Sequence, residues 1–378
     1  MLRVGVLALL LRGAAFGGAA SAPCRDPLVS PYNASSIWNT PLTDAAVLVP
    51  ANLFPGGAVP RDGVFSDDDY FLTTTAASPT IPWYSQGHWN ATPNCLLFPW
   101  SRLVTPALPW PANVTIAQGG NNALALLLPD GDTLVLTQPA YRCAASAPLL
   151  SLLDAAHGRA SLRGAGNWGG HGGSALNAIG GSLRVGELLP GAPPPAHALK
   201  LQLWAAQYYY GAAHGATRAT CFRWPALVCD NYFEDERLYN GSNPLLTPGA
   251  LLAIPLAALP GVQAALATAP ARALAHTLAH YGGLLCDDTY ADRATFNTEH
   301  GFAGAFEGAW GFPFVVSGPG DARPGAAAWL QDVVTLFRAL AIVANNAAGS
   351  PGGGGAGGRG WGARGKKARA CANSWLSQ

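Results

Sequence analysis

Charged residues are scarce in this 378-residue sequence, making up 11% of it and leaving a formal net charge of +1. A protein that follows nucleic-acid phosphates needs a basic face, so we expect no nucleic-acid partner. Lysine is nearly absent, with three residues against 19 arginines, which we interpret as a codon-composition bias. Hydrophobic residues still make up 49% of the chain, enough for a packed core.

Several familiar motifs are missing as well. The sequence has no C-x-x-C pair, no H-E-x-x-H, no phosphate-binding loop with the G-x-x-x-x-G-K-[ST] pattern and no G-x-S-x-G. These absences argue against a structural zinc site, a zinc protease, a P-loop nucleotide enzyme and a serine hydrolase. We therefore expect neither a metal nor a cofactor.

No hydrophobic run is long enough to span a bilayer. The eight residues 4–11 follow a basic start and precede Ala20-Ser21-Ala22, which predicts a signal peptide over residues 1–22. Residues 250–271 carry no charge, but three prolines interrupt them, and we do not expect a membrane span. Four N-x-[ST] sequons, typical of glycosylated secreted proteins, lie at Asn33, Asn90, Asn113 and Asn240.

Seven cysteines are consistent with export to an oxidising compartment. Cys221 and Cys229 would close a short loop and are the pair we expect first. Cys95 with Cys143 is a second candidate pair, and the odd count leaves one thiol over.

The mature chain reads as one β-rich domain over residues 23–348, followed by a glycine-rich flexible tail over 349–378. Apolar runs flank an Asp-Gly turn in 122–143 and predict a hairpin. Further strands are expected at 197–210, 250–254 and 284–288, and helices at 262–280 and 326–344. Because strands outnumber helices and the helices come late, we expect a mainly β (α+β) fold, a β-sandwich or jelly-roll-like core decorated by late helices.

The most unusual stretch is the glycine-dense segment 164–188, GAGNWGGHGGSALNAIGGSLRVGEL. Glycine at this density lets a backbone approach a ligand closely or turn sharply. Polar and aromatic side chains lie between the glycines, and either a binding site or a scaffold of turns would explain them. Those that could project into a site are Trp168, His171, Ser174, Asn177, Arg184 and Glu187.

This segment and HALKLQLWAAQYYY after it resemble a family of secreted bacterial and algal proteins with no assigned activity. That family has an H-G-G-S-G segment, then G-G-x-[IL]-R-x-G-E-L and H-A-L-K. The run from Ser36 to Leu42 is similar to its S-x-W-N-T-P-[LI], and 281–289 to its Y-G-[AG]-x-[IV]-x-D-[DT]. The resemblance covers roughly residues 36–350 and implies one secreted fold without implying a reaction. Ala175 stands where the family usually has glycine.

Carboxylates cluster after a predicted buried strand, at Asp287-Asp288, Glu299 and Glu307. Most glycosidases need two carboxylates flanking a sugar bond, so Asp288 with Glu299 is our first catalytic pair, with Glu307 in reserve. The alternative is that Asp287 bonds a turn and Glu299 is exposed. The triplet Asp67-Asp68-Asp69 is expected in a solvated turn, and Tyr208 and Tyr210 could stack on sugars.

Three functions remain open. The leading hypothesis is a secreted polysaccharide hydrolase using paired carboxylates. A polysaccharide lyase would instead use His171 or a tyrosine as base and Arg184 or Asn177 to neutralise a uronate. A non-catalytic glycan-binding or cell-wall protein would need the aromatic residues alone. In each case the partner is a polysaccharide or cell-wall glycan.

Overall fold

The computed structural model describes residues 26–86, 95–152 and 158–354, all within one compact unit, Asp26–Trp361. The predicted signal peptide, the Asn90 sequon and the tail beyond Gly354 lie outside these residues. Residues 349–354, which the sequence assigned to the tail, are packed: Gly352 and Gly353 are buried, and Gly352 N donates to Asn346 Oδ1 at 3.0 Å.

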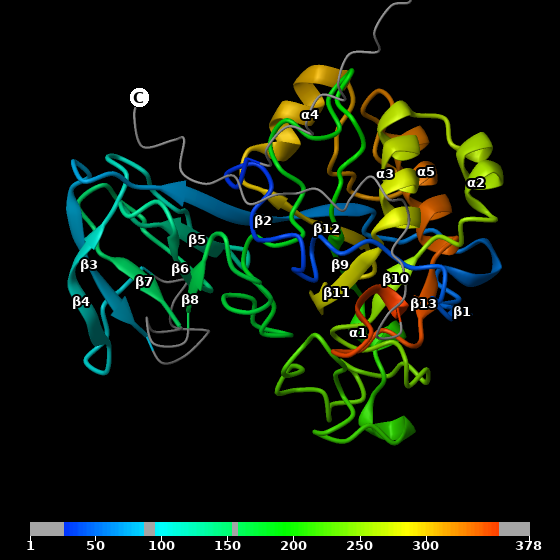
Figure 1. The fold of residues 1–378 in the computed structure, drawn as a ribbon, viewed down its shortest axis with the longest axis horizontal. Helices are drawn as coiled ribbons and strands as arrows, with labels where there is room; N and C mark the ends of the chain where they lie inside the picture. The colour runs from blue at the N-terminus through cyan, green and yellow to red at the C-terminus, as the bar shows by residue number, and fades with distance from the viewer. Residues whose placement is uncertain (1–25, 87–94, 153–157, 355–378) are drawn as a thin grey trace, which may run out of the picture. The chain divides into compact units, whose positions relative to one another are not determined.

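The described chain folds mainly as β-strands joined by long loops, with its helices late in the sequence (Figure 1). This confirms the expected mainly β class. The strands are β1 Leu48–Pro50, β2 Val64–Thr73, β3 Thr80–Ser85, β4 Arg102–Pro109, β5 Ala123–Leu127, β6 Thr133–Thr137, β7 Leu149–Ser151, β8 Arg159–Ser161, β9 Leu199–Leu203, β10 Leu251–Ala253, β11 Gly283–Asp288, β12 Ala294–Glu299 and β13 Ala341–Val343. The α-helices are α1 Ala205–Tyr208, α2 Leu259–Ala265, α3 Ala269–His280, α4 Phe302–Trp310 and α5 Ala326–Arg338.

Ten strands form one mixed sheet in the order β1-β13-β10-β11-β9-β12-β2-β5-β6-β8, and β4-β3-β7 form a smaller sheet. The pairs β11–β9, β12–β2 and β2–β5 are parallel, whereas β12–β9 is antiparallel. The centre of the large sheet is therefore built from segments far apart in sequence.

The predicted hairpin over 122–143 is confirmed as β5 and β6, which pair antiparallel around Asp130-Gly131. Two helix predictions were too long. The helix expected over 262–280 is split into α2 and α3, because Thr268 caps the start of α3 and Pro270 follows at its first turn. The helix expected over 326–344 ends at Arg338, and Ala341–Val343 instead pairs with β1 and β10.

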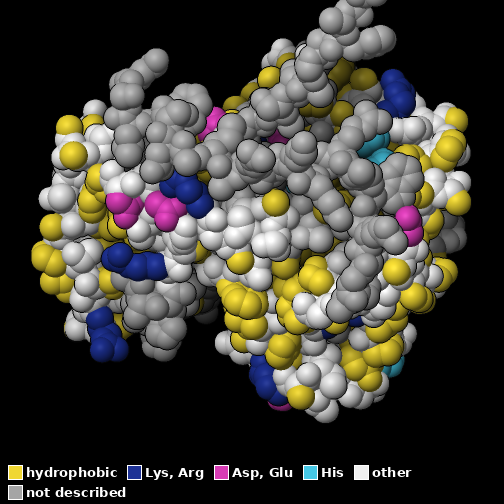
Figure 2. All heavy atoms as spheres, viewed as in Figure 1, with side chains coloured by type: hydrophobic (Ala, Val, Ile, Leu, Met, Phe, Trp, Pro, Cys, Tyr) yellow, Lys and Arg dark blue, Asp and Glu magenta, His cyan; other side chains and the backbone are white. Residues whose placement is uncertain are grey.

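Helices α3 and α5 pack against the sheet through a core that includes Leu278, Trp329 and Phe337. A second core lies under the N-terminal segment around Trp38, and a third joins the small sheet to β5 and β6 through Trp83 and Leu124. Charged side chains are sparse on the face shown in Figure 2, as the composition implies.

The glycine-dense segment folds back on itself and then hydrogen-bonds to Lys200 of β9 and to β12 through Gly181 and Leu183. Trp168 bridges Leu176 and Gly170 bridges Asn177, so residues 168–177 form a short hairpin. Gly180 and Gly181 then pack on the buried ring of Trp38, where a Cβ would lie 2.3 and 2.6 Å from its nearest ring atoms. Only glycine allows this approach.

Candidate functional site

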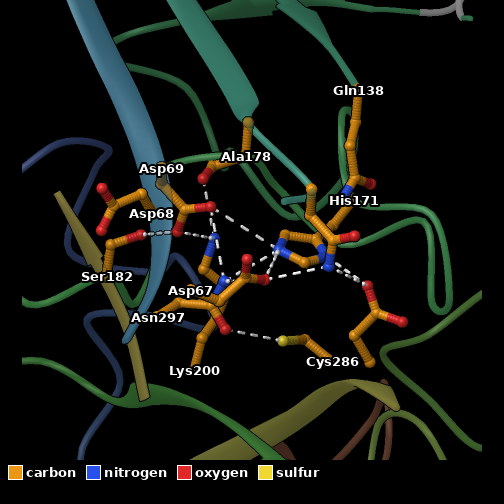
Figure 3. A network of polar contacts seen from close by, with 12 residues as sticks. Asp67, Asp68, Asp69, Gln138, His171, Ala178, Ser182, Lys200, Cys286 and Asn297 are labelled. Atoms are coloured by element: carbon orange, nitrogen blue, oxygen red, sulfur yellow. Dashed lines mark hydrogen bonds and ion pairs between the residues drawn. The ribbon is translucent and has the colours of Figure 1, made fainter. Parts of the chain in front are cut away.

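Neighbouring strands place a row of buried polar side chains on one face of the large sheet (Figure 3). Because side chains alternate along a strand, Asp67 and Asp69 of β2 point the same way. Gln202 of β9 donates from Nε2 to Asp67 Oδ2 at 2.6 Å and to Asn297 Oδ1 of β12 at 3.0 Å. Asn297 Nδ2 lies 3.2 Å from Asp67 Oδ2 and 3.3 Å from Asp69 Oδ1.

A bulge in β11 adds two groups to this row. The register with β9 skips Cys286, so Leu285 and Asp287 face consecutive residues of the partner strand. A bulge redirects side chains in this way and is common beside functional sites. Asp287 thereby joins the row, and the buried Cys286 thiol donates to Asn297 Oδ1 at 3.2 Å.

Lys200 of β9 is fully buried, yet its ammonium group has three acceptors. Nζ lies 2.8 Å from Asp69 Oδ2 and donates to the carbonyl oxygens of Asn177 at 3.0 Å and Ala178 at 2.7 Å. Ser182 Oγ donates to the same Asp69 oxygen at 2.6 Å. Lys200 therefore ties the glycine-dense segment to the sheet through a fully paired charge.

His171, on the hairpin, is buried against this row. Its Nδ1 lies 3.2 Å from Asp287 Oδ2, and its Nε2 lies 3.6 Å from Asp69 Oδ1 and 3.9 Å from Asp67 Oδ2. Asn297 Nδ2 lies 2.9 Å from Nε2, a contact that suits a neutral ring, and the Nδ1 contact is not aligned as a hydrogen bond. Three carboxylates lie within 4 Å of the His171 ring and favour its charged form, whereas only the Asn297 amide favours the neutral form. We therefore assign His171 as protonated and positively charged.

The pKa values follow from this packing. Burial and the Lys200 charge would lower the pKa of His171, but Asp287 and Asp69 outweigh them and raise it to about 9. Burial raises the pKa of Asp67 to about 6, with His171 opposing the shift. Burial would also raise the pKa of Asp69, yet Lys200 and His171 hold it below its usual range.

At the tip of the hairpin, Gly173 lies beside two carboxyl groups. A Cβ on Gly173 would be 2.4 Å from Asp287 Oδ1 and 3.1 Å from Asp230 Oδ1. The two oxygens can therefore be no further apart than the sum of these distances, about 5.5 Å. This limit is shorter than the separation of about 6.5–9.5 Å that inverting glycosidases need, and it allows the separation of about 5–5.5 Å that is typical of retaining enzymes.

The environment of Asp230 makes it an acid at neutral pH. Burial, together with the Asp287 charge, raises its pKa to about 7, although Tyr239 OH donates to Oδ2 at 2.5 Å. Asp287 is positioned from three sides: Asn121 Nδ2 lies 3.2 Å from Oδ2, His171 lies beside the same oxygen, and Asp288 N donates to Oδ1 at 2.9 Å. A proton donor and an oriented carboxylate thus lie side by side.

Asp288 lies next to this pair but makes mainly backbone contacts. Its Oδ1 accepts from Ala205 N at 2.8 Å and Tyr290 N at 3.0 Å, and Tyr232 OH lies 3.4 Å from Oδ2. Burial raises its pKa to about 6.

The structure does not bring Asp288 and Glu299 together. Asp288 pairs with Leu203 at the end of β9, level with the start of β12, whereas Glu299 ends β12. Five residues of strand separate the two levels by about 16 Å. The expected pair of Asp288 with Glu299 depended on the order of the strands in the sheet, and that order could not be deduced from the sequence.

Three other residues that we expected in the site make their polar contacts elsewhere in the fold and not with Asp230 or Asp287. Arg184 Nε donates to Glu299 Oε2 at 2.9 Å, and its guanidinium lies 4.6 Å from the Phe71 ring centre. Glu187 Oε1 lies 3.1 Å from His197 Nε2. Asn177 Oδ1 accepts from Tyr32 OH at 2.6 Å and from two backbone amides. Their polar atoms stabilise the glycine-dense segment, although Arg184 Nη1 is buried and has no hydrogen-bond partner among the residues that the structure describes.

Of the aromatic residues expected in the site, two tyrosines are held in contacts within the fold and one tryptophan is exposed. Tyr208 is buried and accepts from Phe54 N at 3.0 Å, and Tyr210 OH donates to His214 O at 2.8 Å. Trp168, in contrast, is 43% exposed. Glu307 is exposed on α4.

The cysteine pairs are confirmed: Cys221 bonds Cys229 and Cys95 bonds Cys143, leaving Cys286 as the free thiol among the described residues. The sequon residues Asn33, Asn113 and Asn240 are exposed. Within the described ranges, no helix is long and apolar enough to cross a bilayer, and no group of three or more His, Cys, Asp or Glu could hold a metal.

The acidic triplet Asp67-Asp68-Asp69 lies in strand β2 and not in the expected solvated turn. Asp67 and Asp69 are buried in β2, because the parallel neighbours β12 and β5 make it a central strand. Asp230 and Asn297 were missed, since neither lies in a recognisable motif. Lys200 was also missed, although it is the only lysine in the described part of the chain.

Searches against families of known proteins, curated proteins and solved structures find no match to this chain.

Proposed function

We propose that this protein is a secreted hydrolase of polysaccharides in which Asp230 is the acid and Asp287 the nucleophile. The observation that carries the proposal is the approach of these two carboxyl groups to each other beside Gly173, one of them with a pKa near 7. Two disulfides, and no membrane-spanning helix in the described part of the chain, are compatible with secretion.

In the first step, Asp230 donates its proton to the glycosidic oxygen while Asp287 attacks the anomeric carbon. The bond to the leaving sugar breaks, that sugar departs as an alcohol, and a glycosyl ester forms on Asp287. Water then attacks the anomeric carbon, the bond from that carbon to Asp287 breaks, Asp230 takes the water's proton, and both carboxyl groups return to their starting state. His171 and Asn121 hold the Asp287 oxygen that is not facing Gly173.

Two other functions have less support. A lyase needs a cation to neutralise a uronate, but Arg184 pairs with Glu299 and the surface around Asp287 carries carboxylates. A non-catalytic glycan binder is favoured by one observation: Asp287 is only 7% exposed.

The test compares Asp287→Asn and Asp230→Asn with Asp235→Asn, which removes a partly exposed carboxylate whose ion pair among the described residues is with Arg237. Release of reducing ends is measured on xylan, galactomannan, hydroxyethyl cellulose and laminarin. We expect each site variant to lose about 10²–10⁴-fold in rate while the control keeps it. Wild-type activity should fall above pH 7 as Asp230 loses its proton.

Full activity in both site variants contradicts the assignment. Products that absorb in the ultraviolet would instead indicate the lyase, and binding without any product the non-catalytic protein.

A further inference from the structure

Exposed apolar side chains gather along the hairpin and the segments that flank it. Trp168 is 43% exposed, Leu227 48%, Val228 41% and Tyr290 61%. Single exposed apolar residues need no explanation, but several around one set of carboxylates indicate a binding surface.

Hydrogen bonds establish the order of these residues along the surface. Trp168 Nε1 donates to Pro225 O at 2.7 Å, and Leu227 N donates to Ser174 O at 2.9 Å. Further along the same segment, Asp230 adjoins Gly173. The hairpin therefore runs beside residues 225–230, with Trp168 at one end and the carboxylates at the other.

Tyr290 lies beyond the carboxylates. Its ring centre is 5.2 Å from that of Tyr232, which follows Asp230 by two residues and contacts Asp288. Along the chain from Pro225 to Tyr232, the carboxylates thus lie between the two exposed aromatic residues. We call the surface from Trp168 through Leu227, Val228 and Asp230 to Tyr290 the aromatic strip.

Both end rings are fixed in place. The indole of Trp168 is held by its bond to Pro225. Tyr290 has a φ of 53°, a strained value for a tyrosine, and its amide donates to Asp288 Oδ1 at 3.0 Å. Strain of this kind persists where the surrounding structure enforces it and is common at ligand-binding positions. Rigid exposed rings with a polar edge suit sugar stacking.

A buried donor without a partner lies at the same hairpin. Gln138 is 1% exposed, and its Oε1 accepts from Gly172 N, yet Nε2 has no hydrogen-bond partner among the described residues. Figure 3 shows this side chain beside His171. A buried donor left unpaired costs stability, and a substrate hydroxyl would satisfy it.

The charge of the strip selects among polysaccharides. Asp230 is partly exposed and Asp287 and Asp288 are each 7% exposed, whereas the cations His171 and Lys200 are 1% and 0% exposed. Arg218 adjoins the strip, but its guanidinium lies over the Phe233 ring and bonds a backbone carbonyl. A polyuronate would meet repulsion here that an uncharged chain would not.

The geometry points to an extended, uncharged polysaccharide as the substrate, bound along the aromatic strip from Trp168 to Tyr290 and cleaved internally over Asp230 and Asp287. The inference rests on the proposed function for its cleavage step, but the binding surface stands on the exposed rings and the unpaired Gln138 donor.

Binding is measured by affinity electrophoresis of the full chain, with disulfides intact, in gels containing one soluble polymer each. The probes are xylan, galactomannan, hydroxyethyl cellulose and laminarin as uncharged chains, and polygalacturonate and alginate as anionic ones. We expect retardation by at least one uncharged probe and by neither anionic probe. Trp168→Ala and Tyr290→Ala should each weaken that binding by about tenfold, whereas Tyr290→Phe keeps it.

Trp100→Ala is the matched control, because that ring is 53% exposed and lies on the small sheet beside β4, away from the strip. Unchanged binding in both alanine variants, retardation by the anionic probes alone, or no retardation by any probe overturns the inference.

The two proposals fail separately. If Asp287→Asn keeps hydrolytic activity while the strip variants lose binding, the mechanism is wrong and the surface remains. If Asp287→Asn abolishes hydrolysis and the strip variants bind normally, the surface is wrong and the mechanism remains.

Discussion

The charged state of His171 makes folding stability depend on pH in a predictable direction. The pKa of His171 is raised from 6.5 to about 9 in the folded protein. A group that binds its proton more tightly when folded contributes stability that is complete below the unfolded pKa and disappears as pH rises through the folded pKa. We therefore expect stability to decline between about pH 6.5 and pH 9.

The magnitude follows from the shift. The rise in the pKa of His171 from 6.5 to about 9, at about 1.4 kcal/mol for each tenfold change in proton affinity, gives a loss of roughly 3.5 kcal/mol. For a unit of about 330 residues, an unfolding entropy of about 2.1 cal/mol/K per residue converts this loss to a fall of about 5 °C in Tm. The ring is fully buried, so solvent screening does not reduce the effect.

The assay is thermal unfolding between pH 6 and pH 10, compared for the wild type and His171→Gln. The decline above about pH 8 should be absent in the variant, because Asp230, the other group with a pKa near that range, titrates around pH 7 and is mostly deprotonated by then. A histidine titration by NMR gives an independent value. A His171 pKa below 7 would refute the reasoning, and would mean that the 2.9 Å contact with Asn297 holds the ring neutral.

Two further substitutions test the packing around the site. Gly173→Ala would place a Cβ 2.4 Å from Asp287 Oδ1 and displace that carboxylate by about 1 Å, so we expect about 100-fold lower hydrolysis and a lower Tm; Gly304→Ala on α4, with nothing within 4 Å, should lower neither. Lys200→Met leaves Asp69 buried without its cation and should cost about 3–5 kcal/mol in urea unfolding. Adding Asp69→Asn to Lys200→Met should restore part of that loss, and a double variant no more stable than the single one contradicts the pairing.

The elements that local patterns determine could be predicted from the sequence. The hairpin over 122–143 depends on an Asp-Gly turn between apolar runs, and the disulfide from Cys221 to Cys229 on a short loop. The helix ending at Arg338 was overestimated because Ala341–Val343 has the same apolar character in a helix as in a buried strand. Only the neighbouring strands decide between the two.

Only part of the site could be predicted from the sequence, because the rest depends on which strands are neighbours. His171 and the region of Asp287 were identified because glycines and clustered carboxylates are visible in the sequence. Their partners Asp67 and Asn297 come from β2 and β12, which pair in parallel across more than 200 residues of chain. No local pattern encodes such a pairing, so the acid pair was chosen from carboxylates near in sequence instead of Asp230.

The buried row and the hairpin above it have a common electrostatic consequence. Burial raises the pKa of Asp67, Asp230 and Asp288, so each favours the protonated form when folded. Such groups lower stability as pH rises between about 4 and 7, and His171 continues the decline to about 9. Below pH 6 the charged His171 and Lys200 face fewer ionised carboxylates, and Asp230 carries the proton that the proposed reaction needs. Stability and catalysis should therefore both be greatest in mildly acidic solution, because the same buried carboxyl groups control both.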